Sequence, residues 1–178
     1  MPEAYNGGPL SHVPPAKIEL LCAEAARTPP GCFVEFGVYK GGSAWHLARV
    51  AREQGRKLYL FDTFKGMPFQ DDGDRISAGA FAETSADEVR ALIPDAILCV
   101  GVFPATMPAD MPLIAFAHID CDQQRSVRDA WHRFSPLMVK GGTMIFDDVL
   151  VLNPVHVVFD ELVGNRLHAE ADAGLVRF

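Results

Sequence analysis

The 178-residue sequence predicts an α/β domain with a doubly wound, mostly parallel sheet that ends in an antiparallel hairpin at its C-terminal edge. From residue 15 onward, apolar runs of strand length alternate with segments of helical periodicity, which is the order of β-α-β units. Residues 113–119 form an almost continuous apolar run, as expected for a central strand with both faces covered. We therefore expect one domain over residues 15–178, preceded by a flexible segment, residues 1–14.

Composition narrows the classes of partner. A formal net charge of -7 disfavours nucleic acid, which binds to a concentrated basic face. No apolar run approaches the roughly 20 residues of a membrane span, and no leader-like segment opens the chain, so we expect a cytoplasmic protein without a membrane partner. The four cysteines lack C-x-x-C spacing and are expected to be free thiols. Whether the protein forms a homo-oligomer is left open.

The first elements read as a β-α-β unit. A helix is predicted over Pro15–Arg27, because Ile18, Leu21, Cys22 and Ala25 fall on one face, and Pro29-Pro30-Gly31 ends it. A strand at 32–36, a glycine-bearing turn, a helix at 44–54 and a second strand at 57–61 follow.

The middle of the chain opens with a long polar connection, residues 65–83, of the kind that compact domains keep for a lid or a binding loop. Ser85 and Glu88 then form a capping-box pattern for a helix that Pro94 ends. Strands are predicted at 96–100 and 113–119.

The C-terminal third predicts two helices and three strands. Val127, Ala130, Trp131, Phe134 and Met138 share one helix face, and Gly141-Gly142 is expected to end that helix. A strand at 143–146, a helix from Asn153-Pro154 to Val163, and a hairpin within residues 166–178 complete the sheet.

Candidate ligand-binding groups stand at the carboxyl ends of the predicted strands, where open α/β sheets bind ligands. The glycine turn 37–43 lets a ligand approach the backbone and leads into a helix N-terminus that favours an anionic group. Asp62 ends the next strand, where a carboxylate accepts from ribose hydroxyls. Together these features indicate a nucleoside-containing ligand, and both NAD and S-adenosylmethionine fit.

Four aspartates form the third group. Asp120, Asp122, Asp147 and Asp148 follow two strands that we expect to be neighbours, so their carboxylates should crowd together. Such oxygen ligands suit a hard divalent ion such as Mg²⁺, which would lower the pKa of a bound substrate hydroxyl. Asp122 also fits the N-cap of the following helix. His118 is interpreted as a core residue with its hydrogen bonds satisfied.

Four ordered motifs resemble the macrocin O-methyltransferase family: residues 33–43, 59–68, 118–122 and 141–148. The resemblance runs from about Gly31 to the C-terminus and implies a Rossmann-like, class I, metal-assisted enzyme that transfers a methyl group from S-adenosylmethionine to a hydroxyl of a sugar or small natural product. It also implies Mg²⁺ held by Asp120, Asp147 and Asp148, with Asp120 as candidate general base. The cofactor-binding residues that it implies are Glu35, Gly37, Gly41, Gly42, Ser43, Asp62, Thr63, Gly101 and Phe103.

One departure from the family pattern stands out. Where members carry an apolar residue and a tyrosine after the Asp-x-Asp, this chain has Gln123, Gln124 and Arg125, which leaves the small-molecule acceptor open. Two alternative functions remain: a non-catalytic or regulatory protein that binds a nucleoside cofactor, and a nicotinamide-dependent oxidoreductase. A phosphatase of the haloacid dehalogenase type is disfavoured, because only 27 residues separate Asp120 from Asp147.

Overall fold

The sheet of the computed structural model confirms the predicted fold class. The structure describes residues 3–149, 153–163, 168–170 and 173–178. In this part of the chain seven strands form one sheet in the order β5-β4-β3-β6-β7-β9-β8. The first five strands of that order pair in parallel, and β9 and β8 add the expected antiparallel edge. The strands are β3 Cys32–Phe36, β4 Leu58–Asp62, β5 Ile97–Val100, β6 Ile114–Ile119, β7 Met138–Phe146, β8 His168–Glu170 and β9 Ala173–Arg177.

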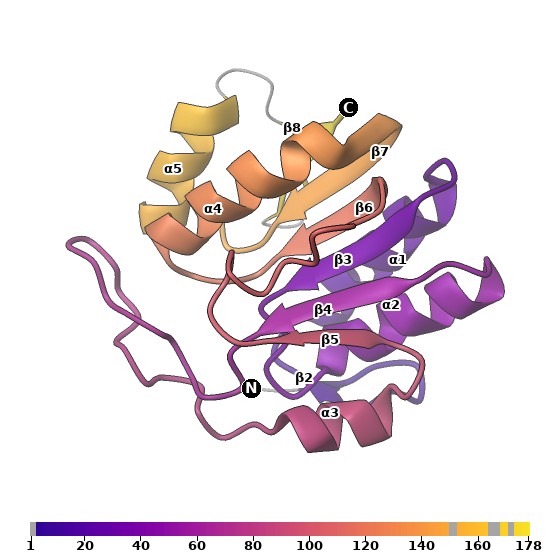
Figure 1. Cartoon of the computed structure of the whole chain (residues 1–178), viewed down its shortest axis with the longest axis horizontal. Helices are drawn as coiled ribbons and strands as arrows, with labels where there is room; N and C mark the ends of the chain where they lie inside the picture. Colours follow the sequence, from indigo (N-terminus) through magenta and orange to yellow (C-terminus); the bar gives the residue numbers. More distant parts are fainter. Residues whose placement is uncertain (1–2, 150–152, 164–167, 171–172) are drawn as a thin grey trace.

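Helices cover both faces of the sheet, with α1 and α2 on one side and α4 and α5 on the other (Figure 1). Because successive strand residues face opposite sides, Phe33 belongs to the buried cluster that contains Leu21 and Leu47, whereas Val34 belongs to the cluster that contains Phe134 on the other face. Each face therefore has its own buried cluster. The helices are α1 Pro15–Arg27, α2 Gly42–Glu53, α3 Ala86–Leu92, α4 Gln124–Phe134 and α5 Asn153–Val163.

The strand order reverses between β3 and β6, which places the ligand-binding end of the sheet there. The parallel ladders continue one residue past the strands: the Asp120 N–H donates to the Phe36 carbonyl at 2.8 Å, and the Asp147 N–H donates to the Ile119 carbonyl at 2.8 Å. The backbones that carry these two aspartates are therefore fixed by the sheet itself.

The N-terminal residues form a two-stranded hairpin, β1 Glu3–Ala4 with β2 Leu10–Ser11. Ser11 is buried against the start of α2, where a Cβ on Gly42 would lie 2.6 Å from the Ser11 Cβ. Gly42 thus permits the hairpin to approach the helix. The flexibility of residues 1–14 stays a prediction.

Two sequence-based expectations about helix ends are wrong. Ser85 caps α3, but its hydroxyl accepts from the Asp87 N–H at 3.3 Å rather than from Glu88. The helix at 124–134 ends before Gly141: Pro136 cannot donate to its ladder, a 3₁₀ turn over Ser135–Leu137 follows, and Met138 already begins β7. The pair Gly141-Gly142 lies within that strand.

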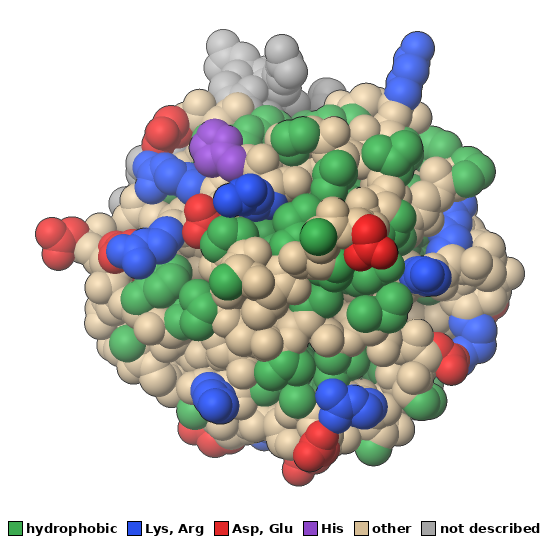
Figure 2. All heavy atoms as spheres, in the orientation of Figure 1, with side chains coloured by type: hydrophobic (Ala, Val, Ile, Leu, Met, Phe, Trp, Pro, Cys, Tyr) green, Lys and Arg blue, Asp and Glu red, His purple; other side chains and the backbone are tan. Residues whose placement is uncertain are grey.

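None of the described helices is long and apolar enough to cross a membrane. On the face drawn in Figure 2, the coloured Lys and Arg side chains are scattered among apolar and acidic ones, without a continuous basic patch.

Substitution of Gly37 tests how closely the backbones that follow β3 and β6 approach each other. It has φ +91°, and a Cβ there would lie 1.7 Å from the Asp120 carbonyl oxygen. Gly55 also has a positive φ of +63°, but nothing lies within 4 Å of its Cβ position. We expect Gly55→Ala to lower the free energy of unfolding by about 1 kcal/mol and Gly37→Ala by about 3 kcal/mol or more. Urea unfolding measures both, and equal losses would contradict the close approach.

Candidate functional site

A cavity of about 510 Å³ opens at the carboxyl ends of β3, β4, β6 and β7, within the size range of small-molecule sites. The hairpin segment 10–14 and the loop between β4 and α3, residues 63–85 (the β4–α3 loop), contribute further walls. Most of the predicted site residues line it: Gly37, Gly42, Ser43, Asp62, Thr63, Gly101, Phe103, Asp120, Asp122, Asp147 and Asp148.

Two predicted cofactor-binding residues do not line this cavity. Gly41 lies at the N-cap of α2 with φ +79°, and its Cβ position is 3.3 Å from the Leu92 side chain. Glu35 is fully buried within the sheet, beside His118 of the neighbouring strand. Both residues lie next to residues that line the cavity but do not face the cavity themselves.

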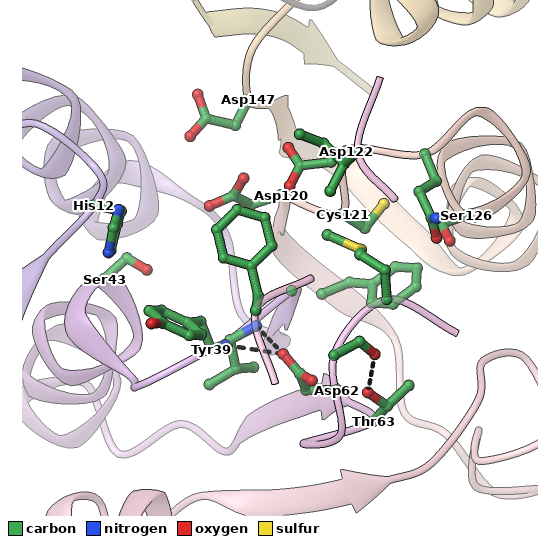
Figure 3. A pocket seen from close by; sticks show the side chains of 18 of the residues that line it. His12, Tyr39, Ser43, Asp62, Thr63, Asp120, Cys121, Asp122, Ser126 and Asp147 are labelled. Atoms are coloured by element: carbon green, nitrogen blue, oxygen red, sulfur yellow. Dashed lines mark hydrogen bonds between the residues drawn. The ribbon is translucent and has the colours of Figure 1, made fainter. Parts of the chain in front are cut away.

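Asp62 fixes the turn that follows β3. Its carboxylate accepts from the backbone N–H groups of Val38 at 2.7 Å and Tyr39 at 2.9 Å (Figure 3), and also from that of Phe64 at 2.7 Å. A carboxylate offers about four lone-pair sites, so three are used and acceptor capacity remains. Asp62 therefore holds the glycine turn in shape and still lines the cavity.

Four aspartates gather at the other end of the cavity, as predicted, and we call Asp120, Asp122, Asp147 and Asp148 the carboxylate cluster. Figure 3 shows the first three of them. Ligand atoms of Asp120, Asp122 and Asp148 lie within 4.8 Å of one another, and so do those of His118, Asp120 and Asp147. The pKa of Asp120 is raised well above its usual range by burial and by the other three carboxylates. Burial and then Asp148 and Asp147 raise the pKa of Asp122 to about 7.

Lys17 of α1 enters the carboxylate cluster, which the sequence analysis missed. Its Nζ donates to Asp147 Oδ1 and lies 3.6 Å from Asp148 Oδ1, and the residue is only 4% exposed. Burial lowers the pKa of Lys17, but Asp147, Asp148 and Asp120 outweigh it, so that pKa is raised. The sequence pattern could have identified Lys17, because it shares a helix face with Leu21 and Ala25, where an apolar residue is expected.

His118 and Glu35 form a buried polar pair beneath the carboxylate cluster. The His118 Nδ1 lies 2.8 Å from Glu35 Oε1, and both side chains are fully buried. Among the described residues, the His118 Nε2 and Glu35 Oε2 atoms have no hydrogen-bond partner. The expectation of a fully satisfied core histidine is therefore wrong for one ring nitrogen, which leaves a polar atom available at the cluster.

The departure at residues 123–125 attaches the β4–α3 loop to α4. The Gln123 side-chain amide donates to the Phe69 carbonyl. The Arg125 guanidinium lies 4.3 Å from the centre of the Phe69 ring and 2.5 Å from Asp71 Oδ1. These contacts hold the loop over the side of the cavity that the helix borders.

Asp74 of the same loop caps α4, so the expected capping role of Asp122 is wrong. The Asp74 Oδ1 accepts from the Gln124 N–H at 3.1 Å, and Asp74 is buried. Asp122 has φ +57°, and its carboxylate points toward Asp120 (Figure 3). The cap supplied from the loop leaves the Asp122 carboxylate to the cavity.

Three aromatic rings line the wall beside the hairpin. The His12 ring lies 5.3 Å from that of Tyr39 and 6.4 Å from that of Phe81, and the last two are 5.6 Å apart, all edge to face. The rings join the hairpin, the turn after β3 and the β4–α3 loop into one wall.

Arg125→Ala tests the loop attachment. The variant loses the cation–π contact and the ion pair, which should lower the free energy that holds the loop against α4 by about 1 kcal/mol. We therefore expect amide exchange in residues 63–85 to become about fivefold faster. The matched control is Arg128→Ala, which removes only an exposed pair with Glu161. Hydrogen exchange read by mass spectrometry compares the two, and an unchanged loop in Arg125→Ala would contradict the attachment.

Asp122→Asn tests the crowding of the carboxylates. Because the pKa of Asp122 rises from 3.8 to about 7 on folding, the native state binds more protons than the unfolded state between these values, and stability falls as pH rises. The variant cannot titrate there. Its gain in unfolding free energy over wild type should therefore be larger at pH 8 than at pH 5, in urea titrations with EDTA. A gain that shrinks with pH would count against the crowding.

Comparison with known proteins agrees with this geometry. The sequence matches the family described as "Methyltransferase domain" over residues 34–149. It is 30% identical over 142 residues to the 8-demethyl-8-(2,3-dimethoxy-alpha-L-rhamnosyl)-tetracenomycin-C 4'-O-methyltransferase of Streptomyces olivaceus, covering 68% of this chain and 54% of that protein. It is 28% identical to the demethyldecarbamoylnovobiocin O-methyltransferase of Streptomyces niveus, over 74% of this chain and 58% of that one.

A solved structure shares the fold. The O-methyltransferase NovP superposes with a TM-score of 0.83 at 22% identity, over 94% of this chain and 81% of that chain. The present chain spans little more than half the length of the curated relatives that it matches. Because the family match covers more than half of the chain, from β3 to just beyond β7, the chain belongs to the methyltransferase domain family.

Proposed function

We propose that this protein transfers a methyl group from S-adenosylmethionine to a hydroxyl of a sugar or small natural product. One observation carries the proposal: a single cavity joins the glycine turn and Asp62 at one end to the carboxylate cluster at the other. The two curated relatives are O-methyltransferases by name. A nicotinamide oxidoreductase would also use the glycine turn and Asp62, but its reaction does not need the carboxylate cluster.

The cofactor is proposed to occupy the end formed by β3 and β4. Gly37 and Ser43 would border its methionine part, Asp62 and Thr63 its ribose, and Gly101 and Phe103 its adenine. Two solved structures of similar fold hold this cofactor or its product. TomG is in complex with S-adenosylmethionine and has a TM-score of 0.61, and a Bacillus cereus O-methyltransferase is in complex with S-adenosylhomocysteine and has a TM-score of 0.60. Glu35 acts through His118 in this proposal and not by contact with the cofactor.

The residues present fit a hard divalent cation such as Mg²⁺. The donor set is built of carboxylate oxygens, and a buried His118 ring nitrogen without a partner among the described residues lies beside it. Asp120, Asp147 and Asp148 would hold the ion. When bound, it would polarise the acceptor hydroxyl and lower its pKa.

The chain's own part in the reaction is positioning and proton transfer. In the proposed reaction the acceptor oxygen would form a bond to the methyl carbon while the carbon–sulfur bond breaks and its electron pair stays on sulfur, and the Asp120 carboxylate would take the hydroxyl proton. Burial and the neighbouring carboxylates raise the pKa of Asp120, which makes its carboxylate a stronger base toward the hydroxyl proton. The cavity walls would exclude water and align the oxygen, carbon and sulfur atoms.

Calorimetric titration with S-adenosylhomocysteine tests the cofactor. We expect micromolar binding to wild type and none of NADH. The reverse preference would support an oxidoreductase and contradict the proposal.

Asp147→Ala separates catalysis from cofactor binding. Its methyl transfer to a panel of nucleotide-linked and glycosidic sugars, read as release of S-adenosylhomocysteine, should be lost, whereas its affinity for that product should stay within a few fold of wild type. Equal loss of both would assign Asp147 a structural role. If wild type binds the cofactor product but methylates nothing in the panel, a non-catalytic cofactor-binding protein is favoured.

A further inference from the structure

A buried ammonium group already stands in the carboxylate cluster. Lys17 reaches it from α1, is 4% exposed, and pairs with Asp147 and Asp148. The side chain is enclosed by the fold and is not an exposed lysine that happens to lie near an acid.

Asp147 Oδ1 is fully occupied in this arrangement. It accepts from Lys17 Nζ and from the Asp148 N–H at 2.8 Å, which uses both lone pairs of that oxygen. A cation that binds through Asp147 therefore either uses the other oxygen, with the ammonium a few ångströms away, or displaces Lys17. Like charges at this distance in a buried site repel strongly.

We infer that Lys17 is an internal competitor for the divalent cation. Its ammonium partly neutralises the carboxylate cluster while no metal is bound, and it has to leave Asp147 for the ion to bind tightly. The affinity of the site for a divalent ion is therefore held low by Lys17. This inference rests on the metal centre of the proposed function and adds its regulation by the chain's own cation.

The other lysine that lines the cavity serves as the matched control. Lys40 is exposed, and its Nζ lies 5.1 Å from the centre of the Tyr39 ring, beside the turn after β3. Removing its charge alters the net charge of the cavity by the same amount as removing that of Lys17, but solvent screens it from the cluster.

Binding of Mn²⁺, followed by the electron paramagnetic resonance signal of the free ion, tests the inference. We expect Lys17→Met and Lys17→Gln to bind Mn²⁺ at least tenfold more tightly than wild type. Lys17→Arg, which keeps the charge, and Lys40→Met should remain within about threefold of wild type. Circular dichroism and titration with S-adenosylhomocysteine show that each variant is folded.

The outcomes separate the two proposals. If wild type and the neutral Lys17 variants bind Mn²⁺ equally, or the variants bind it more weakly, the metal centre stands and competition by Lys17 is overturned. If no variant binds Mn²⁺ while all bind S-adenosylhomocysteine, the metal part of the proposed function fails and this inference with it. Tighter binding by Lys40→Met equal to that of Lys17→Met would also overturn it, because net charge alone would then explain the gain.

Discussion

The close approach of the β3 and β6 backbones beyond the end of the sheet is the constraint on which the cavity depends. The Asp120 N–H donates to the Phe36 carbonyl, and Gly37, the first residue after β3, lies directly against the Asp120 carbonyl. This contact places the glycine turn beside the first aspartate of the cluster. A side chain at position 37 would separate the two ends of the cavity that the proposed reaction brings together.

The carboxylate cluster is a second constraint, and it opposes stability. Buried charges destabilise a fold unless they are paired, and here burial and the neighbouring carboxylates raise the pKa values of Asp120 and Asp122. Lys17 relieves part of this repulsion from α1. The helix that covers one face of the sheet thus also supplies charge to the ligand-binding end.

The sequence predicted the sheet and the positions of the cluster because both follow from local rules: strand-length apolar runs, and aspartates directly after two of them. It did not predict which segment caps α4, since Asp74 lies 50 residues before Gln124 and meets it only in three dimensions. The resemblance placed Glu35 at the cofactor, whereas the residue is fully buried beside His118 and does not line the cavity. The resemblance took no account of strand alternation, which places Glu35 on the same face as Phe33, under α1 and α2.

The two ends of the cavity are built differently. The end assigned to the cofactor is formed largely by residues directly after strands, whose positions the ladder hydrogen bonds determine. The end proposed for the acceptor adds walls from the hairpin and the β4–α3 loop. These walls are attached through side chains: Gln123 and Arg125 on one side and the rings of Tyr39 and Phe81 on the other. Substitutions in these attachments change the shape of the acceptor end without altering the sheet. Under the proposed function, Gln123 and Arg125, which depart from the family pattern, would therefore bear on which hydroxyl compound is accepted, while the residues that conform to the pattern would hold the cofactor.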